Sequence, residues 1–131
     1  MKLAFYYHIP IKVEQNGTLH LPSYLGVFLD SLAQQVDQLY LVMHESISDY
    51  EEADYKLTSV NIKFVNLGLK TPAWHRVFNH KKILKRKLDQ ILQCEVLLVR
   101  SPSPLAPYFG LYLKGVKLVY MIVGDYSSSI M

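Results

Sequence analysis

Short apolar runs alternate along this sequence with segments that carry an apolar stripe at helical spacing, and this alternation limits the fold more than any other feature. The runs themselves lack helical spacing, which is typical of strands that are buried on both faces. Five such strands are predicted, at about residues 3–9, 39–43, 60–65, 95–100 and 117–123. Strands that alternate with helices indicate an α/β fold with a mostly parallel sheet, because right-handed crossovers place helices on both of its faces.

The segments with helical spacing predict three amphipathic helices. The first covers about residues 25–36 and the third about residues 103–113. The second is the longest and extends over about residues 72–93, with an apolar face made of Trp74, Val77, Leu84, Leu88, Ile91 and Leu92. The stretch between residues 45 and 54 is acidic and is expected to be a loop or a short helix.

The expected architecture is a Rossmann-like three-layer sandwich whose sheet has the strand order 3-2-1-4-5. Half of the chain (50%) is hydrophobic, and 131 residues can bury one core without help from disulfides or a structural metal. A single domain over residues 1–131 is therefore predicted. No apolar run approaches the roughly 18 residues of a membrane span.

This strand order predicts where a ligand would bind. The order reverses between the first and fourth strands, and ligands of such sheets bind beyond the carboxyl ends of the strands at that point. His8 follows the first strand, Arg100 and Ser101 end the fourth, and Asp125 follows the fifth. His8 is either an acceptor contact or a core histidine, and Asp125 either faces the cleft or forms a turn. Ser101 suits a turn better than a catalytic role.

Arg100 is the strongest candidate among them, because an unpaired guanidinium at the end of a hydrophobic strand is costly to bury. It either faces the cleft and binds an anion or forms an ion pair, for example with Asp125. Gly17 is the glycine of the first loop. Its missing Cβ either lets backbone N–H groups approach phosphates or simply permits a turn.

Several common functional motifs are missing. The sequence has no dinucleotide fingerprint, no phosphate-binding P-loop and no nucleophile elbow of a hydrolase. Its five histidines do not have the spacing of a metal site, so no metal is expected. The catalytic residues, if there are any, cannot be identified from the sequence.

Positive charge is strongly segregated along the chain. Nine bases and no acid lie between Tyr55 and Leu88, whereas the rest has five bases against 11 acids, a net charge of −6. The outer face of the predicted long helix carries Arg76, Lys82, Lys85, Arg86 and Lys87, and Phe78 and Ile83 are expected to be exposed among them. Such a face either binds an anionic membrane surface or is only solvated. Nucleic acid is not expected, because exposed aromatic residues for base stacking cannot be identified.

Three stretches follow one another in a pattern that occurs in a known family. They are residues 32–37 (Leu-Ala-Gln-Gln-Val-Asp), 95–101 (Glu-Val-Leu-Leu-Val-Arg-Ser) and 115–120 (Gly-Val-Lys-Leu-Val-Tyr). Together with the first strand and its glycine-containing loop, they resemble the beginning of glycosyltransferase family 4, the "group 1" enzymes of the GT-B fold. The resemblance covers essentially the whole chain, although its motifs are loose patterns. It departs from the family in having one glycine, Gly17, instead of two, and Gly124-Asp125 instead of a His-Asp pair, which puts a histidine contact to the acceptor in doubt.

The resemblance implies the N-terminal, acceptor-binding half of a retaining glycosyltransferase. Such an enzyme transfers a sugar from a nucleotide-sugar donor to a lipid-linked or polysaccharide acceptor. The donor would bind a C-terminal domain through two glutamates eight positions apart, a pair that does not occur in these 131 residues. No cofactor is therefore expected in this domain, which should be inactive alone. A cytoplasmic location, peripheral at the inner face of the membrane, is also implied. The alternative is a non-catalytic Rossmann-like module that docks on anionic surfaces.

Overall fold

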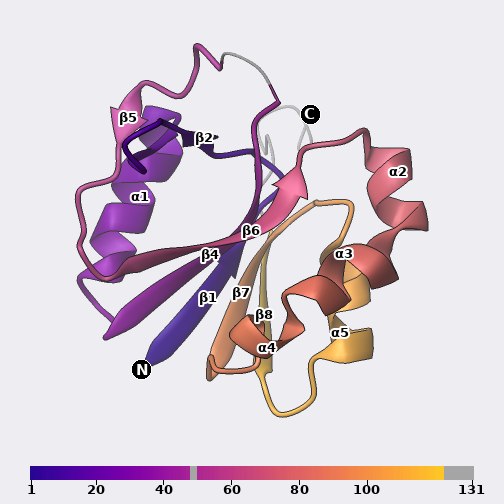
Figure 1. Cartoon of the computed structure of the whole chain (residues 1–131). Coiled ribbons are helices and arrows are strands. Elements are labelled where there is room, and N and C mark those ends of the chain that lie inside the picture. Colours follow the sequence, from indigo (N-terminus) through magenta and orange to yellow (C-terminus); the bar gives the residue numbers. More distant parts are fainter. Residues whose placement is uncertain (48–49, 123–131) are drawn as a thin grey trace, which may run out of the picture.

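A five-stranded parallel sheet forms the centre of the protein in a computed structural model that describes residues 1–47 and 50–122 (Figure 1). The strand order is β6-β4-β1-β7-β8. The bounds of these strands are β1 (Lys2–Tyr6), β4 (Gln38–Glu45), β6 (Ile62–Leu69), β7 (Val96–Ser101) and β8 (Lys117–Ile122). Numbered among themselves along the chain, the five strands have the predicted order 3-2-1-4-5.

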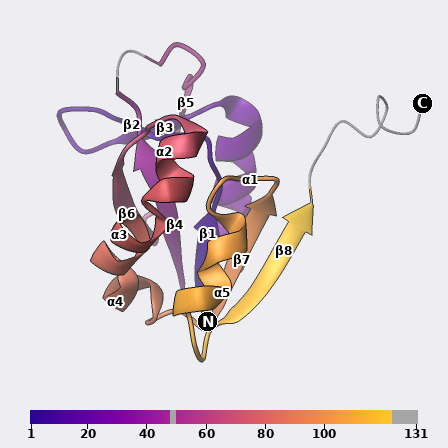
Figure 2. The ribbon, with the colours of Figure 1, turned by 90° about the vertical axis from the view of Figure 1, so that its right-hand side faces the viewer.

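Helices cover both faces of this sheet, which confirms the predicted Rossmann-like three-layer sandwich (Figures 1 and 2). One face is covered by α1 (Ser23–Ala33). The opposite face is covered by α2 (Ala73–Phe78), α3 (His80–Arg86), α4 (Leu88–Ile91), the 3-10 helix η1 (Ala106–Tyr108) and α5 (Phe109–Tyr112). None of the helices in these described ranges is long and apolar enough to cross a lipid bilayer.

The central strand explains why the apolar runs are continuous. Leu3 and Phe5 of β1 pack on the side of α1, against residues such as Leu29. Ala4 and Tyr6 point to the other side, where they join a cluster that includes Phe109. Both sets are buried, so every position of the strand after the exposed Lys2 contributes to one of two cores.

A second, smaller sheet was not predicted. It is antiparallel and has the order β2-β3-β5, made of β2 (Lys12–Val13), β3 (Leu19–Leu21) and β5 (Tyr55–Lys56). Buried Ile11 connects it to the main sheet through a bridge to Glu45 at the end of β4. The first predicted strand therefore ends at Tyr6 instead of Ile9, because the chain leaves the main sheet there.

The prediction of one long helix over about residues 72–93 is wrong. The chain forms three short helices instead, with non-helical backbone at Asn79 and Lys87. The Asn79 side chain donates a hydrogen bond to the carbonyl of His75 (2.8 Å), so a side chain competes with the helical pattern at this break. A helical wheel does not apply across such breaks. Ile83 is consequently buried and Trp74 is 64% exposed, the reverse of what the wheel predicts.

Candidate functional site

The carboxyl ends of β1 and β7 lie side by side, since these two strands are paired in parallel. The segments that follow them meet at the same edge of the sheet. The Ser103 hydroxyl donates a hydrogen bond to the carbonyl of Arg100 (2.8 Å) and lies 3.4 Å from Nδ1 of His8. The fold therefore brings together the ends of the first and fourth predicted strands, as the sequence predicted for the point of reversal.

Arg100 lies on the α1 side of this edge, between aromatic rings. Its guanidinium carbon is 4.6 Å from the centroid of the Tyr7 ring and 5.7 Å from that of Tyr24. Its Nε is buried without a hydrogen-bond partner. A pocket of about 340 Å³ is lined here by Tyr24, Phe28, Arg100 and Met121. Ser101 ends β7 at the same edge but is not among the residues that line this pocket. Asp125 lies outside the described residues.

Arg76 lies on the opposite side of the same edge, and its position corrects the sequence prediction. The sequence placed it on the outer basic face, but its side chain is only 4% exposed. Its Nε and Nη1 atoms are buried without a hydrogen-bond partner. It lines a second pocket of about 370 Å³, together with His8, Ala73, Pro102, Ser103 and Pro104. Arg76 is therefore not part of an exposed surface. The prediction assumed one helix through residue 93, but α2 ends at Phe78, so its orientation on the sheet is independent of the helices that follow.

Further cationic or titratable groups surround Arg76. His44 of β4 is 1% exposed; its Nδ1 lies 3.3 Å from the carbonyl of Gly68, and its Nε2 has no partner. Burial, followed by the charge of Arg76, lowers the pKa of His44 to about 4, so its ring is neutral. Burial and Arg76 also lower the pKa of Lys70, which follows β6.

The electrostatic surroundings of His8 are positive as well. Burial lowers the pKa of His8, and the charges of Lys70, Arg76 and Arg100 lower it further. Within the described ranges, the ion pairs are those of the N-terminus with Asp37 and of Lys12 with Glu14. No acidic side chain of the described residues therefore neutralises the cations at this edge. The arrangement is suited to binding an anion.

Gly17 lies elsewhere, in the turn of the β2–β3 hairpin. Its φ of +86° is a conformation that favours glycine, and its N–H donates to the carbonyl of Glu14 (2.9 Å). The amide of Gly17 itself is therefore engaged in the turn, and its conformation fits the turn interpretation.

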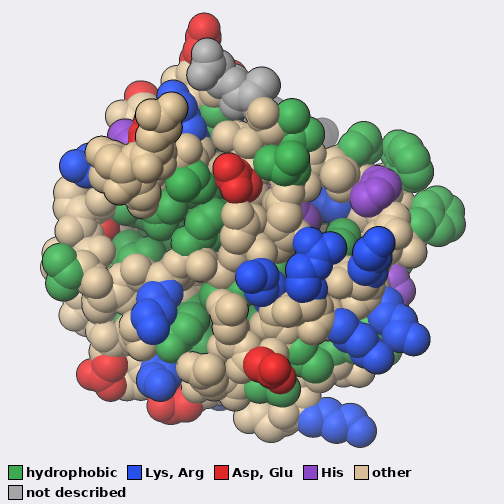
Figure 3. Space-filling model, viewed as in Figure 1, with side chains coloured by type: hydrophobic (Ala, Val, Ile, Leu, Met, Phe, Trp, Pro, Cys, Tyr) green, Lys and Arg blue, Asp and Glu red, His purple; other side chains and the backbone are tan. Residues whose placement is uncertain are grey.

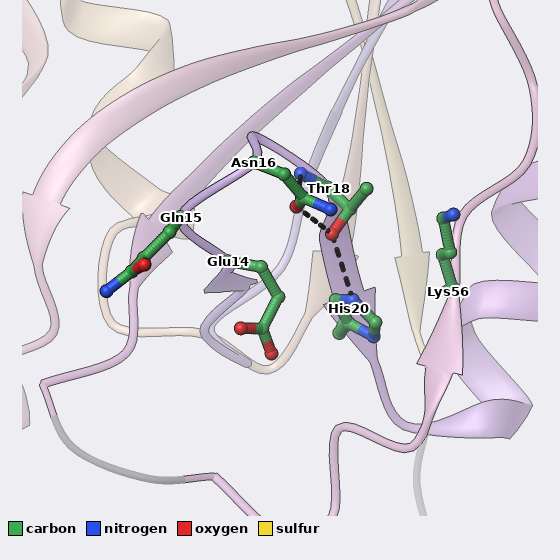
Figure 4. A pocket seen from close by; sticks show the side chains of 6 residues that line it. All are labelled: Glu14, Gln15, Asn16, Thr18, His20 and Lys56. Carbon is green, nitrogen blue, oxygen red and sulfur yellow. Dashed lines mark hydrogen bonds between the residues drawn. The ribbon is translucent and has the colours of Figure 1, made fainter.

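The pocket beside this hairpin is lined by Glu14, Gln15, Asn16, Thr18, His20 and Lys56 (Figure 4). The Thr18 hydroxyl donates to Oδ1 of Asn16 (2.7 Å) and lies 3.2 Å from Nε2 of His20. Three of the six lining side chains are thus hydrogen-bonded to one another.

The exposed bases form a separate surface on α3, which we call the basic surface. It is a groove of about 580 Å³ lined by Phe78, Asn79, Lys81, Lys82, Lys85 and Arg86 (Figure 3). Phe78 is 81% exposed, as the sequence predicted. Lys87, in contrast, is half-buried at the break between α3 and α4 and does not line the groove.

Neither a metal site nor a relative identifies the protein. Among the residues that the structure describes, no three His, Cys, Asp or Glu side chains come together as metal ligands would. No protein-family model, no curated protein and no solved structure matches this chain. Its function has to be inferred from the chemistry of these surfaces.

Proposed function

We propose that residues 1–131 form the acceptor-binding domain of a glycosyltransferase that transfers a sugar from a nucleotide-sugar donor to a lipid-linked or polysaccharide acceptor. The observation that supports this most is the set of uncompensated cations at the edge where the strand order reverses. Arg76 and Arg100 lie on either side of His8 there, without acidic partners among the described residues. Sheets of this order bind their ligands at that edge.

The Arg100 pocket has the chemistry that an acceptor sugar requires. Tyr24 is 58% exposed and offers an apolar ring face with a hydroxyl at its end. The guanidinium of Arg100 lies beside this ring and can donate hydrogen bonds to hydroxyl or anionic groups of the acceptor. The donor would be bound by a second domain that faces the same edge. Residues 1–131 would contribute the acceptor contacts and positive charge.

The test uses the protein encoded by the complete reading frame. Sugar transfer from UDP- or GDP-sugars to the acceptor should fall at least tenfold in kcat/KM when Arg100→Ala removes the guanidinium, because a hydrogen bond to a charged group contributes about 1.5–3 kcal/mol. Lys117→Ala, an exposed lysine of β8 at the amino end of its strand, is the control and should keep full activity.

Two outcomes would contradict the proposal. One is an unchanged transfer rate for Arg100→Ala at an unchanged melting temperature. The other is a reading frame without a second α/β domain and its paired glutamates.

A second candidate function, docking on an anionic lipid surface, is favoured by the basic surface. Lys82, Lys85 and Arg86 are exposed there beside Phe78. Trp74, one turn earlier on α2, is also strongly exposed. Apolar side chains among cations are typical of surfaces that bind the headgroup region of anionic membranes. Docking of this kind would place the protein at the cytoplasmic face of the membrane, and it is compatible with a lipid-linked acceptor.

Charge reversal tests this second candidate. Replacing Lys82 and Arg86 by Glu removes two attractions and adds two repulsions. At about 1 kcal/mol per charge, the change of about 4 kcal/mol should weaken binding to phosphatidylglycerol vesicles close to a thousandfold. The matched control reverses the exposed Lys114 and Lys117 and should bind like the wild type.

Co-sedimentation with vesicles at low and physiological salt is the measurement, and binding should weaken as salt rises. Equal binding by the Lys82/Arg86 double variant would contradict docking through this surface. Binding to single-stranded oligonucleotides but not to vesicles would also contradict it.

A further inference from the structure

Arg76 is the least explained group in the described part of the chain. It is more than nine-tenths buried, yet Nε and Nη1 have no hydrogen-bond partner within bonding geometry. Burial raises the pKa of the Tyr6 hydroxyl, which is close enough for Arg76 to lower it in part, but this neutral group does not compensate the charge. A buried, unpaired charge costs several kcal/mol, and proteins normally pair it or leave it in water. The guanidinium lines the pocket that it shares with His8 and Ser103, so a ligand in that pocket could reach the unpaired atoms.

Ser103 and His8 are the other polar side chains that line this pocket. Ser103 has a hydroxyl and His8 a ring nitrogen within 3.4 Å of each other. Lys70 is close enough to both His8 and Arg76 for their charges to influence one another.

The acid nearest to Lys70 along the paired strands is engaged elsewhere. The carboxylate of Glu45 accepts a hydrogen bond from Asn66 (2.8 Å), and no ion pair within the described ranges includes it. The pocket is thus lined by one cation, a hydroxyl and an imidazole, with no carboxylate among its lining residues. Lys70 adds a second positive charge nearby.

We propose that this pocket, lined by Arg76, His8 and Ser103, binds a phosphate group of the substrate, held by the guanidinium of Arg76 with the charge of Lys70 nearby. A phosphate carries close to two negative charges and three acceptor oxygens, which suit the free N–H groups of Arg76 and its positive surroundings better than a carboxylate does. The planar guanidinium of Arg76 can donate two parallel hydrogen bonds to it. This inference names a substrate class for the edge described under Proposed function and rests on that function for its biological meaning.

The phosphate could belong to a sugar phosphate or to a nucleotide, and the test separates these sources. Inorganic phosphate is the first probe, titrated calorimetrically into the chain at pH 7, with acetate as the comparison anion. We expect one site that prefers phosphate to acetate. Arg76→Gln should weaken phosphate binding at least tenfold, Arg76→Lys should weaken it less, and Lys117→Gln at the opposite edge should bind like the wild type. Glucose 6-phosphate and UDP are then titrated in separate arms, and the tighter ligand indicates the source.

The shift of the melting temperature by phosphate is a second measurement. This shift would not depend on Arg76 if the residue only stabilised the fold. Phosphate should raise the melting temperature of the wild type more than that of Arg76→Gln, because a ligand bound to the folded state adds to the general salt effect that both proteins share. Without phosphate, Arg76→Gln should melt no lower than the wild type, since it removes an unpaired buried charge. If this variant fails to fold, Lys70→Gln should still show weakened phosphate binding.

The inference is overturned if the wild type does not bind phosphate, or if Lys117→Gln weakens binding as much as Arg76→Gln. Its failure is distinguishable from failure of the proposed function. Sugar transfer by a protein that binds no phosphate in this pocket would overturn the phosphate site and keep the glycosyltransferase. Phosphate binding by a protein that transfers no sugar would keep the phosphate site and overturn the glycosyltransferase.

Discussion

The buried polar residues of this protein differ in whether their side chains are fully hydrogen-bonded. Within the described part of the chain they are Asp30, His44 and Arg76. Asp30 is fully engaged: it accepts hydrogen bonds from the Tyr55 hydroxyl (2.7 Å) and the Ser59 hydroxyl (2.8 Å), among others. His44 and Arg76 both keep buried nitrogens without partners. A satisfied buried group stabilises the fold, whereas an unsatisfied one suggests a missing ligand.

Asp30 should therefore be a stability residue. Burial alone would raise its pKa, but the hydrogen bonds from Tyr55 and Ser59 outweigh this effect and hold the pKa below its usual value. Asp30→Ala leaves several buried donors without an acceptor and should lower the free energy of unfolding by about 2–4 kcal/mol. Chemical denaturation measures this loss. Asp37→Ala, at the exposed pair with the N-terminus, is the control and should cost much less, because solvent screens such pairs. Similar losses in the two variants would contradict the role of Asp30.

His44 should make stability depend on pH. Its pKa of about 4 in the folded protein lies below the ordinary histidine value of 6.5, so the unfolded chain binds a proton more readily. The neutral ring thus contributes its full stability above pH 6.5, and this contribution is lost as pH falls towards 4. The total is about 3 kcal/mol. Unfolding free energies measured from pH 7 to 4 should fall less steeply in His44→Gln, and identical pH profiles would contradict this.

At the scale of secondary structure, a glycine determines how α1 meets the small sheet. A Cβ at Gly26 would lie 2.3 Å from Cδ1 of Tyr55, far inside contact distance. The missing side chain lets β5 pack closely on α1, and this contact positions the Tyr55 hydroxyl for its bond to Asp30.

Gly26→Ala should consequently destabilise the protein, although alanine favours helices. Overpacking costs about 1–3 kcal/mol and should exceed the gain in helix propensity of about 1 kcal/mol. Gly110→Ala in α5 is a matched control, because its new Cβ would meet only a methyl carbon of Leu118 at an ordinary 3.8 Å. Thermal unfolding should rank Gly26→Ala below the wild type and Gly110→Ala at or above it. The reverse ranking would mean that Tyr55 moves aside without cost.

At the scale of the whole molecule, the proposed function requires a second domain that binds the donor. The chain contains no donor-site motif, and its cations at the carboxyl edge lie within open pockets. We expect residues 1–131 alone to neither hydrolyse UDP- or GDP-sugars nor transfer sugar from them. Nucleotide release measured above an enzyme-free blank would contradict this expectation. The protein encoded by the complete reading frame, assayed under the same conditions, is the positive control.

The sequence by itself determined the main sheet of this protein, including its strand order and the edge at which β1 and β7 end together. The strands can be predicted because strands buried on both faces appear as apolar runs in the sequence. Their order can be predicted because the crossover connections between parallel strands are right-handed. His8 and Arg100 were found for the same reason, since each follows or ends such a run. The small antiparallel sheet was missed, because strands of two or three residues carry too little periodicity to detect.

Only the tertiary structure decided which way the basic residues face. A helical wheel assumes one continuous axis, and the breaks at Asn79 and Lys87 rotate each short helix independently of the next. Arg76 therefore points into the edge of the sheet, while Lys82 and Arg86 remain outside. Lys70 and His44 join Arg76 only because β6 and β4 are neighbours in the sheet. Burial of charge depends on packing between elements distant in the sequence, which local patterns do not encode.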